Sequence, residues 1–267
     1  MFSSNRDAGK LISRYFGKIT HLEARAKKER LSLVSDADEF AQDLIVNRIK
    51  KHFPKDHILA EERDLAKVSS SMKEGFLWII DPLDGTINFL HGFPLFSVSV
   101  AVVFNGDVVL GSIFDPVRDE FFWAQKGKGA YLNKKKISVT KTKNIEDALM
   151  ITGFAYDRAT RAAFYLSFYE KFVRVAHDVR RTGSACIDLA WVASGRVEGF
   201  WEWNLNPWDV ASGVVLVNEA GGDMTHFNGK PYSVFNTEET LATNGKVHKG
   251  CLKIISSIRA KHARSAK

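Results

Sequence analysis

The chain has 267 residues, 45% of them hydrophobic, and a formal net charge of +7. This length is near the upper limit for one hydrophobic core, so one layered domain and two closely packed halves both fit. The longest apolar run, around residues 95–104, is too short to cross a bilayer, and no apolar signal core follows Met1. We therefore expect a cytoplasmic protein without a membrane span.

The basic excess is concentrated at residues 134–136 and 249–267. A basic balance can attract nucleic acid or anionic substrates. No nucleic-acid-binding motif accompanies these charges, so solvated surface segments explain them better, and we do not expect a nucleic-acid partner. The two cysteines, Cys186 and Cys251, have neither metal-ligand spacing nor the number that a disulfide framework needs.

In the first part of the chain, apolar residues at three- and four-residue steps predict a helix over about 5–30. A second helix should be capped by Ser35 or Asp36 and run to about Lys51. A short strand should follow at 58–60, ending at Glu61, and then a polar loop or small hairpin over 64–74.

The apolar run 76–80 predicts a buried strand that ends at Pro82, because proline cannot donate to a sheet. Asp81 and Asp84 then flank a tight corner at Gly85, and a short helix should begin near Ile87.

From residue 95 to 139, alternating apolar residues and the turn pair Asn105-Gly106 predict an antiparallel meander. Strands are expected next near 148–152, 175–178, 196–203 and 240–243. Helices are expected over 160–173, 185–193, 207–220 and from about 247. This interleaving predicts a layered α/β architecture. We divide it into an N-terminal half, 1–145, and a C-terminal half, 146–267, that together form one compact unit.

The corner at 81–86 carries the pattern with the clearest chemical meaning. Two carboxylates and free backbone N–H groups at one point suit a divalent cation bridged to a phosphate. A plain Asp-rich turn explains the same residues. The segment alone does not decide between these interpretations.

The run Asp81-Pro82-Leu83-Asp84-Gly85-Thr86 resembles the signature of the inositol monophosphatase family, which comprises Mg²⁺-dependent, lithium-sensitive sugar phosphatases. Three further motifs follow the family's order, at 33–38, at Glu61-Glu62, and at 207–213 with 219–222. The resemblance covers about residues 27–244. It implies a five-layer α-β-α-β-α sandwich, a homodimer and phosphomonoesterase activity.

The resemblance also implies the metal ligands. Glu61, Asp81 and the Leu83 carbonyl would hold one Mg²⁺, and Asp81, Asp84 and Asp209 a second, while a third, looser ion would use Glu61 and water. Four clustered carboxylates repel one another unless cations neutralise them, and oxygen-only ligation favours Mg²⁺ over zinc. Without the resemblance, the sequence would favour a surface position for Glu61 and a helix-capping role for Asp209.

The remaining roles follow from the same resemblance. Backbone N–H groups of Gly85 and Thr86 would hold phosphate oxygens. Glu61 and Thr86, the latter supported by Asp38, are candidates to accept the proton of the attacking water. The residues implied to contact the substrate are Asp84, Gly183, Ser184, Ala185, Glu202 and Asp209.

We therefore expect Mg²⁺-dependent hydrolysis of inositol monophosphate to inositol and phosphate by metal-activated water. Glu202 should repel a second phosphate, whereas Arg158, Arg161 or Arg180 could hold one if it reached the pocket. A fructose-1,6-bisphosphatase or dual-specificity sugar phosphatase is the alternative within this class. The alternative from another class is an RNA- or transcription-complex-binding protein with secondary phosphatase activity.

Overall fold

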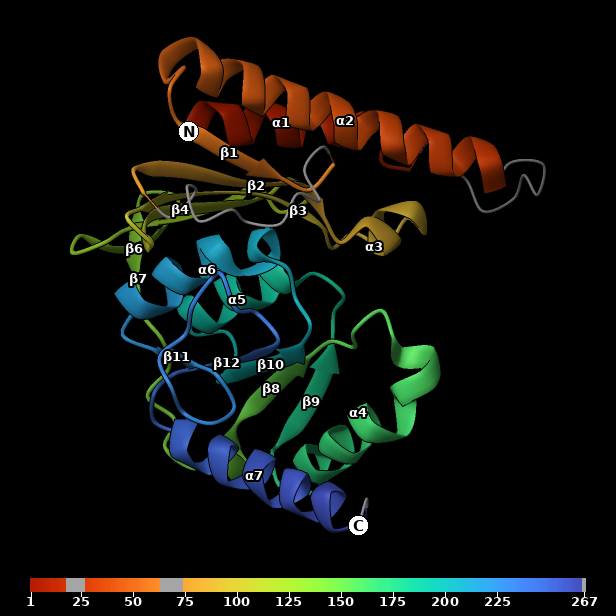
Figure 1. Ribbon diagram of the computed structural model, residues 1–267, viewed down its shortest axis with the longest axis vertical. Helices are drawn as coiled ribbons and strands as arrows, with labels where there is room; N and C mark the ends of the chain where they lie inside the picture. Colours follow the sequence, from red (N-terminus) through yellow and green to blue (C-terminus); the bar gives the residue numbers. More distant parts are fainter. Residues whose placement is uncertain (18–26, 63–73, 266–267) are drawn as a thin grey trace.

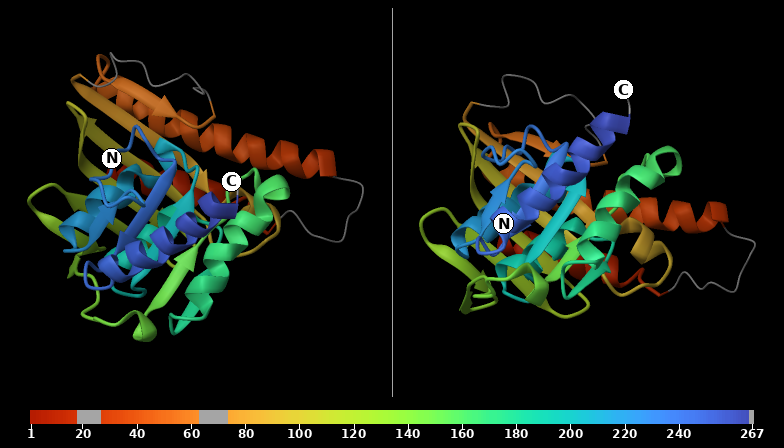
Figure 2. Two further views of the ribbon diagram at one scale, coloured as in Figure 1. Left: turned by 60° about the horizontal axis from the view of Figure 1, so that its bottom comes forward. Right: turned by 90° about the horizontal axis from the view of Figure 1, so that it is seen from below.

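The computed structural model describes residues 1–17, 27–62 and 74–265, which form five layers of alternating helices and sheets (Figure 1). This confirms the predicted α-β-α-β-α architecture. Two helices cover the outer face of one sheet, two lie between the sheets, and two cover the far face of the other sheet (Figures 1 and 2). The helices of these layers are α1 (Phe2–Ser13), α2 (Lys27–His52), α4 (Arg158–Val173), α5 (Ala185–Ala193), α6 (Pro207–Glu219) and α7 (His248–Ser265).

The first sheet has seven strands in sequence order. β1 runs parallel to β2, and every later pair is antiparallel. Asn105 and Gly106 both have positive φ (49° and 88°), as a tight two-residue hairpin requires, so the predicted meander is confirmed. The strands are β1 (His57–Ala60), β2 (Phe76–Asp84), β3 (Ser97–Phe104), β4 (Asp107–Asp115), β5 (Glu120–Gln125), β6 (Gly129–Leu132) and β7 (Lys135–Ile137).

The second sheet has the order β11-β12-β10-β8-β9. β8 runs parallel to both β9 and β10, so these three strands end at the same edge of the sheet. The segment between β7 and β8 holds a short 3-10 helix at Ile145–Asp147. The proposed boundary at residue 145 lies in this connection and stays a prediction. The strands are β8 (Leu149–Thr152), β9 (Asp178–Arg181), β10 (Gly199–Trp203), β11 (Asp223–Thr225) and β12 (Glu239–Thr243).

Several predicted boundaries are wrong. α2 begins at Lys27, so Ser35 and Asp36 lie inside this helix instead of capping it. α1 ends at Ser13, and residues 18–26 of the predicted first helix lie outside the described residues. The predicted loop at 64–74 also lies outside them except for its last residue. β9 begins where the predicted strand at 175–178 ends, and β11 was not predicted, because strands of three or four residues carry little periodicity.

The strand before the acidic corner is longer than predicted. β2 continues through Pro82 to Asp84, and its pairing with β3 shifts register between Asp81 and Asp84. Such an irregularity accommodates a residue that cannot donate to the ladder, which is why proline does not end the strand here. Gly85 follows with φ of +90° and precedes the short helix α3 (Thr86–Leu90), which confirms the predicted helix after the corner.

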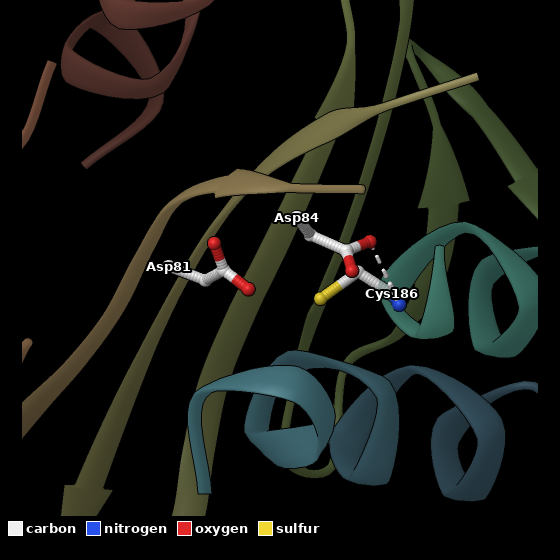
Figure 3. Close-up of side chains that lie close together, drawn as sticks. All are labelled: Asp81, Asp84 and Cys186. Atoms are coloured by element: carbon white, nitrogen blue, oxygen red, sulfur yellow. Dashed lines mark hydrogen bonds between the residues drawn. The ribbon is translucent and has the colours of Figure 1, made fainter. Parts of the chain in front are cut away.

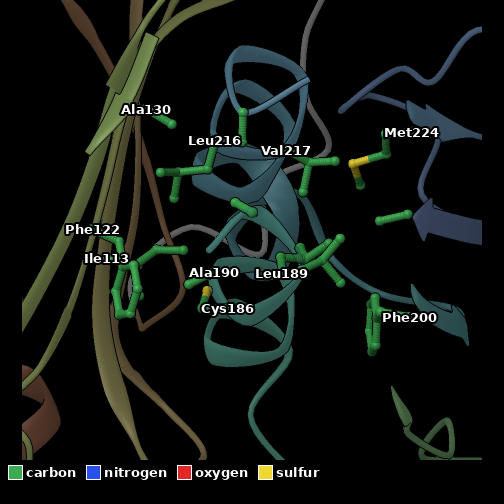
Figure 4. Packing of buried hydrophobic residues seen from close by; sticks show 14 of the residues in the cluster. Ile113, Phe122, Ala130, Cys186, Leu189, Ala190, Phe200, Leu216, Val217 and Met224 are labelled. Carbon is green, nitrogen blue, oxygen red and sulfur yellow. The ribbon is translucent and has the colours of Figure 1, made fainter. Parts of the chain in front are cut away.

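The middle layer carries a large part of the core (Figure 4). Side chains of α5 and α6 pack against Ile113 and Phe122 of the first sheet and against Phe200 of the second. The two helices approach closely where Gly213 of α6 faces Leu189 of α5. A Cβ added at Gly213 would lie 2.6 Å from the Leu189 Cβ, so a glycine is needed for this packing distance.

We predict that Gly213→Ala lowers the free energy of unfolding by about 1–3 kcal/mol, because the two middle helices must move apart. Gly250→Ala in α7 is the matched control. Its added Cβ would meet only Ile145 Cδ1, at 4.0 Å, so alanine's helix preference should leave stability unchanged or raise it by up to about 1 kcal/mol. Urea unfolding measures both variants. Equal stability of Gly213→Ala and the wild type would contradict the close approach.

Candidate active site

The acidic corner at the end of β2 holds its two carboxylates by different contacts. Asp81 is 1% exposed, and its Oδ1 accepts the Leu83 N–H at 3.0 Å. Asp84 Oδ2 accepts the Cys186 N–H (3.1 Å), the Ser97 hydroxyl (3.2 Å) and the Ser184 hydroxyl. Figure 3 shows the two carboxylates beside each other, with Asp84 next to Cys186 at the start of α5. These three bonds fix the Asp84 carboxylate at Oδ2, and the Ala185 N–H also interacts with this carboxylate.

Gly85 has no room for a side chain. A Cβ at this position would lie 2.9 Å from the Leu95 carbonyl oxygen, and the backbone has a positive φ that other residues rarely adopt. The Thr86 hydroxyl donates to the Leu83 carbonyl (3.0 Å) instead of to Asp38, the partner suggested by the sequence. The conformation of the corner is therefore stabilised by the Thr86 hydroxyl and requires glycine at position 85.

Asp209 has two roles in the structure. At the third position of α6, its Oδ2 accepts the Asn206 N–H at 2.6 Å, and the Asn206 side chain completes a capping box. Asp209 also lines the same pocket as Asp81 and Asp84. The helix cap and the predicted ligand position are therefore compatible, because the cap uses only one carboxylate oxygen.

Glu61 follows β1 and reaches the pocket, whereas its neighbour Glu62 is exposed, as the alternation of an extended chain predicts. The Glu61 N–H donates to the Ile80 carbonyl (3.3 Å), which ties this residue to β2. Asp38 lies on α2, is 3% exposed and feels the charges of Glu61 and Glu62. Asp38 does not line the pocket.

A single pocket brings together eleven of the twelve predicted site residues, Asp38 being the exception. Ser184 is 1% exposed, and its hydroxyl is used to cap α5 and to bind Asp84. The predicted residues that line the pocket are Glu61, Asp81, Leu83, Asp84, Gly85, Thr86, Gly183, Ser184, Ala185, Glu202 and Asp209.

Sequence reasoning missed part of the pocket mouth. Tyr156 and Arg181 line it, and so does Arg158, for which an exposed helix position without a site role seemed the better explanation. Arg180, which the sequence pointed to, instead pairs with Asp178 outside the pocket. Adjacent residues of a strand point to opposite faces, so the pattern allowed one of the two arginines but could not select it.

Burial and mutual repulsion make this cluster hard to ionise. Burial raises the pKa of Asp81 and of Asp209 well above the usual value, and the neighbouring carboxylates raise both further. Burial, then the Glu62 charge, raises the pKa of Glu61 to about 7. The same two effects, in the same order, raise the pKa of Asp38 to about 9. Bound cations would relieve this repulsion.

The donor atoms fit a hard divalent cation. Asp81, Asp84 and Cys186 offer ligand atoms within 4.8 Å of one another. Burial raises the pKa of the Cys186 thiol, and its Sγ donates to the Asp209 carbonyl (3.2 Å), so this cysteine is a neutral donor. The carboxylates and the Leu83 carbonyl are then an oxygen-only set, which suits Mg²⁺.

Comparison with known proteins gives one consistent family. The model of the inositol monophosphatase family matches residues 2–260. The chain is 38% identical to a protein named Nus factor SuhB from Xylella fastidiosa, over 98% of this chain and 90% of that one. It is 36% identical to a fructose-1,6-bisphosphatase/inositol-1-monophosphatase from Thermotoga maritima, over 95% and 93%. The solved inositol monophosphatase from Anabaena superposes with a TM-score of 0.83 at 36% identity, over 96% and 93%.

We predict that chelating divalent cations makes stability fall as the pH rises from about 5 to about 9. The folded state retains protons on Glu61 and Asp38 that the unfolded state releases near pH 4. This contribution is complete below the unfolded pKa and is lost as the pH passes about 7 and then about 9. Urea unfolding at constant ionic strength measures it. Excess Mg²⁺ should flatten the decline, and identical profiles with chelator and with Mg²⁺ would contradict a cation at this cluster.

Proposed function

The chain belongs to the inositol monophosphatase family and is a phosphatase, and we propose that it hydrolyses inositol monophosphate to inositol and phosphate with Mg²⁺. The observation that carries this proposal is the convergence of acidic oxygens from three elements in one pocket. Glu61 comes from the end of β1, Asp81 and Asp84 from β2, and Asp209 from α6.

We assign Glu61, Asp81 and the Leu83 carbonyl to one Mg²⁺, and Asp81, Asp84 and Asp209 to a second. A third ion would use Glu61 and water. Bound Mg²⁺ supplies an activated water and neutralises the charge that develops on the leaving oxygen. The fixed orientation of Asp84 and Asp209 supports this assignment, because a backbone N–H group holds one oxygen of each carboxylate.

The protein's own groups would bind and orient the ester and move one proton. Gly85 allows the backbone to approach phosphate oxygens without a side chain between them. Glu61, with a pKa near neutrality before metal binds, suits acceptance of the water's proton. Thr86 is the second candidate acceptor, and its bond to the Leu83 carbonyl also positions a proposed ligand. In this proposal Asp38 does not contact the ester, and it affects the site only through its electrostatic interactions with Glu61 and Asp81.

The alcohol part of the substrate would lie against Glu202 and the backbone of 183–185. The Glu202 carboxylate packs against Gly153, where any side chain would overlap it, so its position is closely constrained. It can accept hydrogen bonds from ring hydroxyls, which supports a polyol phosphate. Fructose 1,6-bisphosphate is the alternative substrate, because the Thermotoga relative carries both activities in its name.

Among the described residues, no helix is both long and apolar enough to cross a membrane. Separately, we propose a homodimer, which the family resemblance implies, and a cytoplasmic location. Binding to RNA or to a transcription complex is a second candidate function, suggested by the relative named as a Nus factor and by the net charge of +7. An RNA titration across salt concentrations tests it independently of phosphate release.

The decisive experiment measures phosphate release from inositol 1-phosphate with Mg²⁺ and with chelator. Activity should require Mg²⁺, and Asp81→Asn should lower kcat/KM by about a thousandfold, equivalent to about 4 kcal/mol of transition-state stabilisation, because both proposed ions lose a ligand. Asp119→Asn is the matched control: it makes the same change at a carboxylate that is 79% exposed and outside the pocket, and it should retain activity. Near-normal turnover of folded Asp81→Asn would refute the two-ion assignment.

We predict inhibition by lithium. Li⁺ is small and strongly hydrated, so it can compete for the position between Asp84 and Asp209, but with half the charge it stabilises departing phosphate poorly. Inhibition should weaken in Asp209→Ala, which should itself be slow. Steady-state rates with LiCl, compared with equal NaCl, measure the effect. Equal rates in both salts would contradict an exchangeable ion at this position.

A further inference from the structure

The pocket is lined by more acidic than basic residues. Its acidic residues number five, at 61, 81, 84, 202 and 209, and its basic residues are Arg158 and Arg181. Four of the acids belong to the proposed metal site, which the cations would neutralise. The two arginines therefore provide the positive charge that the protein itself contributes to this pocket.

These two guanidinium groups differ from their neighbours in their ion pairing. Arg158 and Arg181 are both exposed, and neither forms a salt bridge within residues 1–17, 27–62 and 74–265. Their neighbours behave differently: Arg161 pairs with Asp157 at 3.3 Å, and Arg180 pairs with Asp178. Arg158 is thus available to an anion, and so is Arg181, whose charge also acts on the buried carboxyl groups of Asp188 and Glu202. The adjacent arginines are paired with local carboxylates.

Arg181 lies beside a residue assigned to the substrate hydroxyls. Arg181 ends β9, and its Nη1 lies 2.6 Å from where a Gly183 Cβ would be, so the guanidinium covers that backbone. Arg158 begins α4. In Figure 1 the end of β9 and the start of α4 lie on the same side of the molecule as α3. Burial raises the pKa of Glu202, and the Arg181 charge opposes that rise, so Arg181 also lies within electrostatic range of Glu202.

We propose that Arg158 and Arg181 form a second anion subsite at the pocket mouth, which binds the non-reacting phosphate of a sugar or polyol bisphosphate. This inference rests on the proposed function, because the reacting ester must lie at the carboxylates. Guanidinium groups bind phosphate through charge-assisted, often bidentate hydrogen bonds. The Arg181 charge also offsets the repulsion that Glu202 alone would exert on a second phosphate.

The reaction balances without a further reactant. Water supplies the oxygen that joins phosphorus at the carboxylate end, and the departing alkoxide takes a proton. One inorganic phosphate leaves, and the sugar retains the phosphate held by the arginines. Because that group does not change during the reaction, its contacts should act mainly on KM.

The test compares kcat/KM for fructose 1,6-bisphosphate and inositol 1-phosphate, both with Mg²⁺, as a ratio for each variant. Arg158→Gln and Arg181→Gln should each lower the bisphosphate-to-monophosphate ratio about tenfold or more, chiefly through a higher KM for the bisphosphate. Arg161→Gln and Arg180→Gln are matched controls on the same helix and strand, and they should keep the wild-type ratio. Arg158→Lys and Arg181→Lys retain the charge and should keep an intermediate ratio.

The outcomes separate the two proposals. Two outcomes refute the subsite and leave the phosphatase assignment standing. In the first, wild type hydrolyses inositol 1-phosphate with Mg²⁺ but does not hydrolyse the bisphosphate. In the second, the bisphosphate-to-monophosphate ratio is the same in wild type and in both glutamine variants. An equal fall in the control variants also refutes it. If wild type releases no phosphate from either ester, the proposed function fails and the subsite fails with it.

Discussion

The hydrogen bonds to Asp84 Oδ2 are the contact on which the site depends. They join the end of β2 in the first sheet to the start of α5, about a hundred residues later in the chain. Ser184 takes part twice, because its hydroxyl donates to Asp84 while its oxygen caps α5 at the Ile187 N–H. The same contact therefore fixes the acidic corner and the backbone of 183–185 relative to each other, which sets the distance between the metal end and the substrate end of the pocket.

Burying this many carboxylates together costs stability, and the fold offsets part of the cost with fixed donors. Backbone N–H groups hold one oxygen each of Asp81, Asp84 and Asp209. A carboxylate held in this way keeps its orientation without a cation. The clustered carboxylates lower the stability of the fold, but the metal ligands are already oriented before a cation binds. Such preorganisation is common in metal-dependent active sites.

Both acidic and basic residues line the pocket, and this has a consequence for selectivity. Glu202 alone would favour substrates with a neutral, hydroxylated alcohol part. Arg181, which lies over Gly183 and near Glu202, changes that expectation, since it adds a positive group beside the acidic one. The balance between Glu202 and the two arginines, rather than the metal ligands, would then decide which phosphate esters are accepted.

The sequence by itself determined the layered α/β class, the meander after Asn105-Gly106 and eleven residues of the pocket, because periodicity, turn residues and four motifs in family order are local signals. Element ends near Pro82, Ser35 and β9 were missed, since pairing and packing with distant segments decide them. Which of Arg180 and Arg181 enters the pocket, and which partner Thr86 takes, also depended on the tertiary structure. Side-chain direction and charge pairing are set by neighbours far away in the chain, so no local pattern contains them.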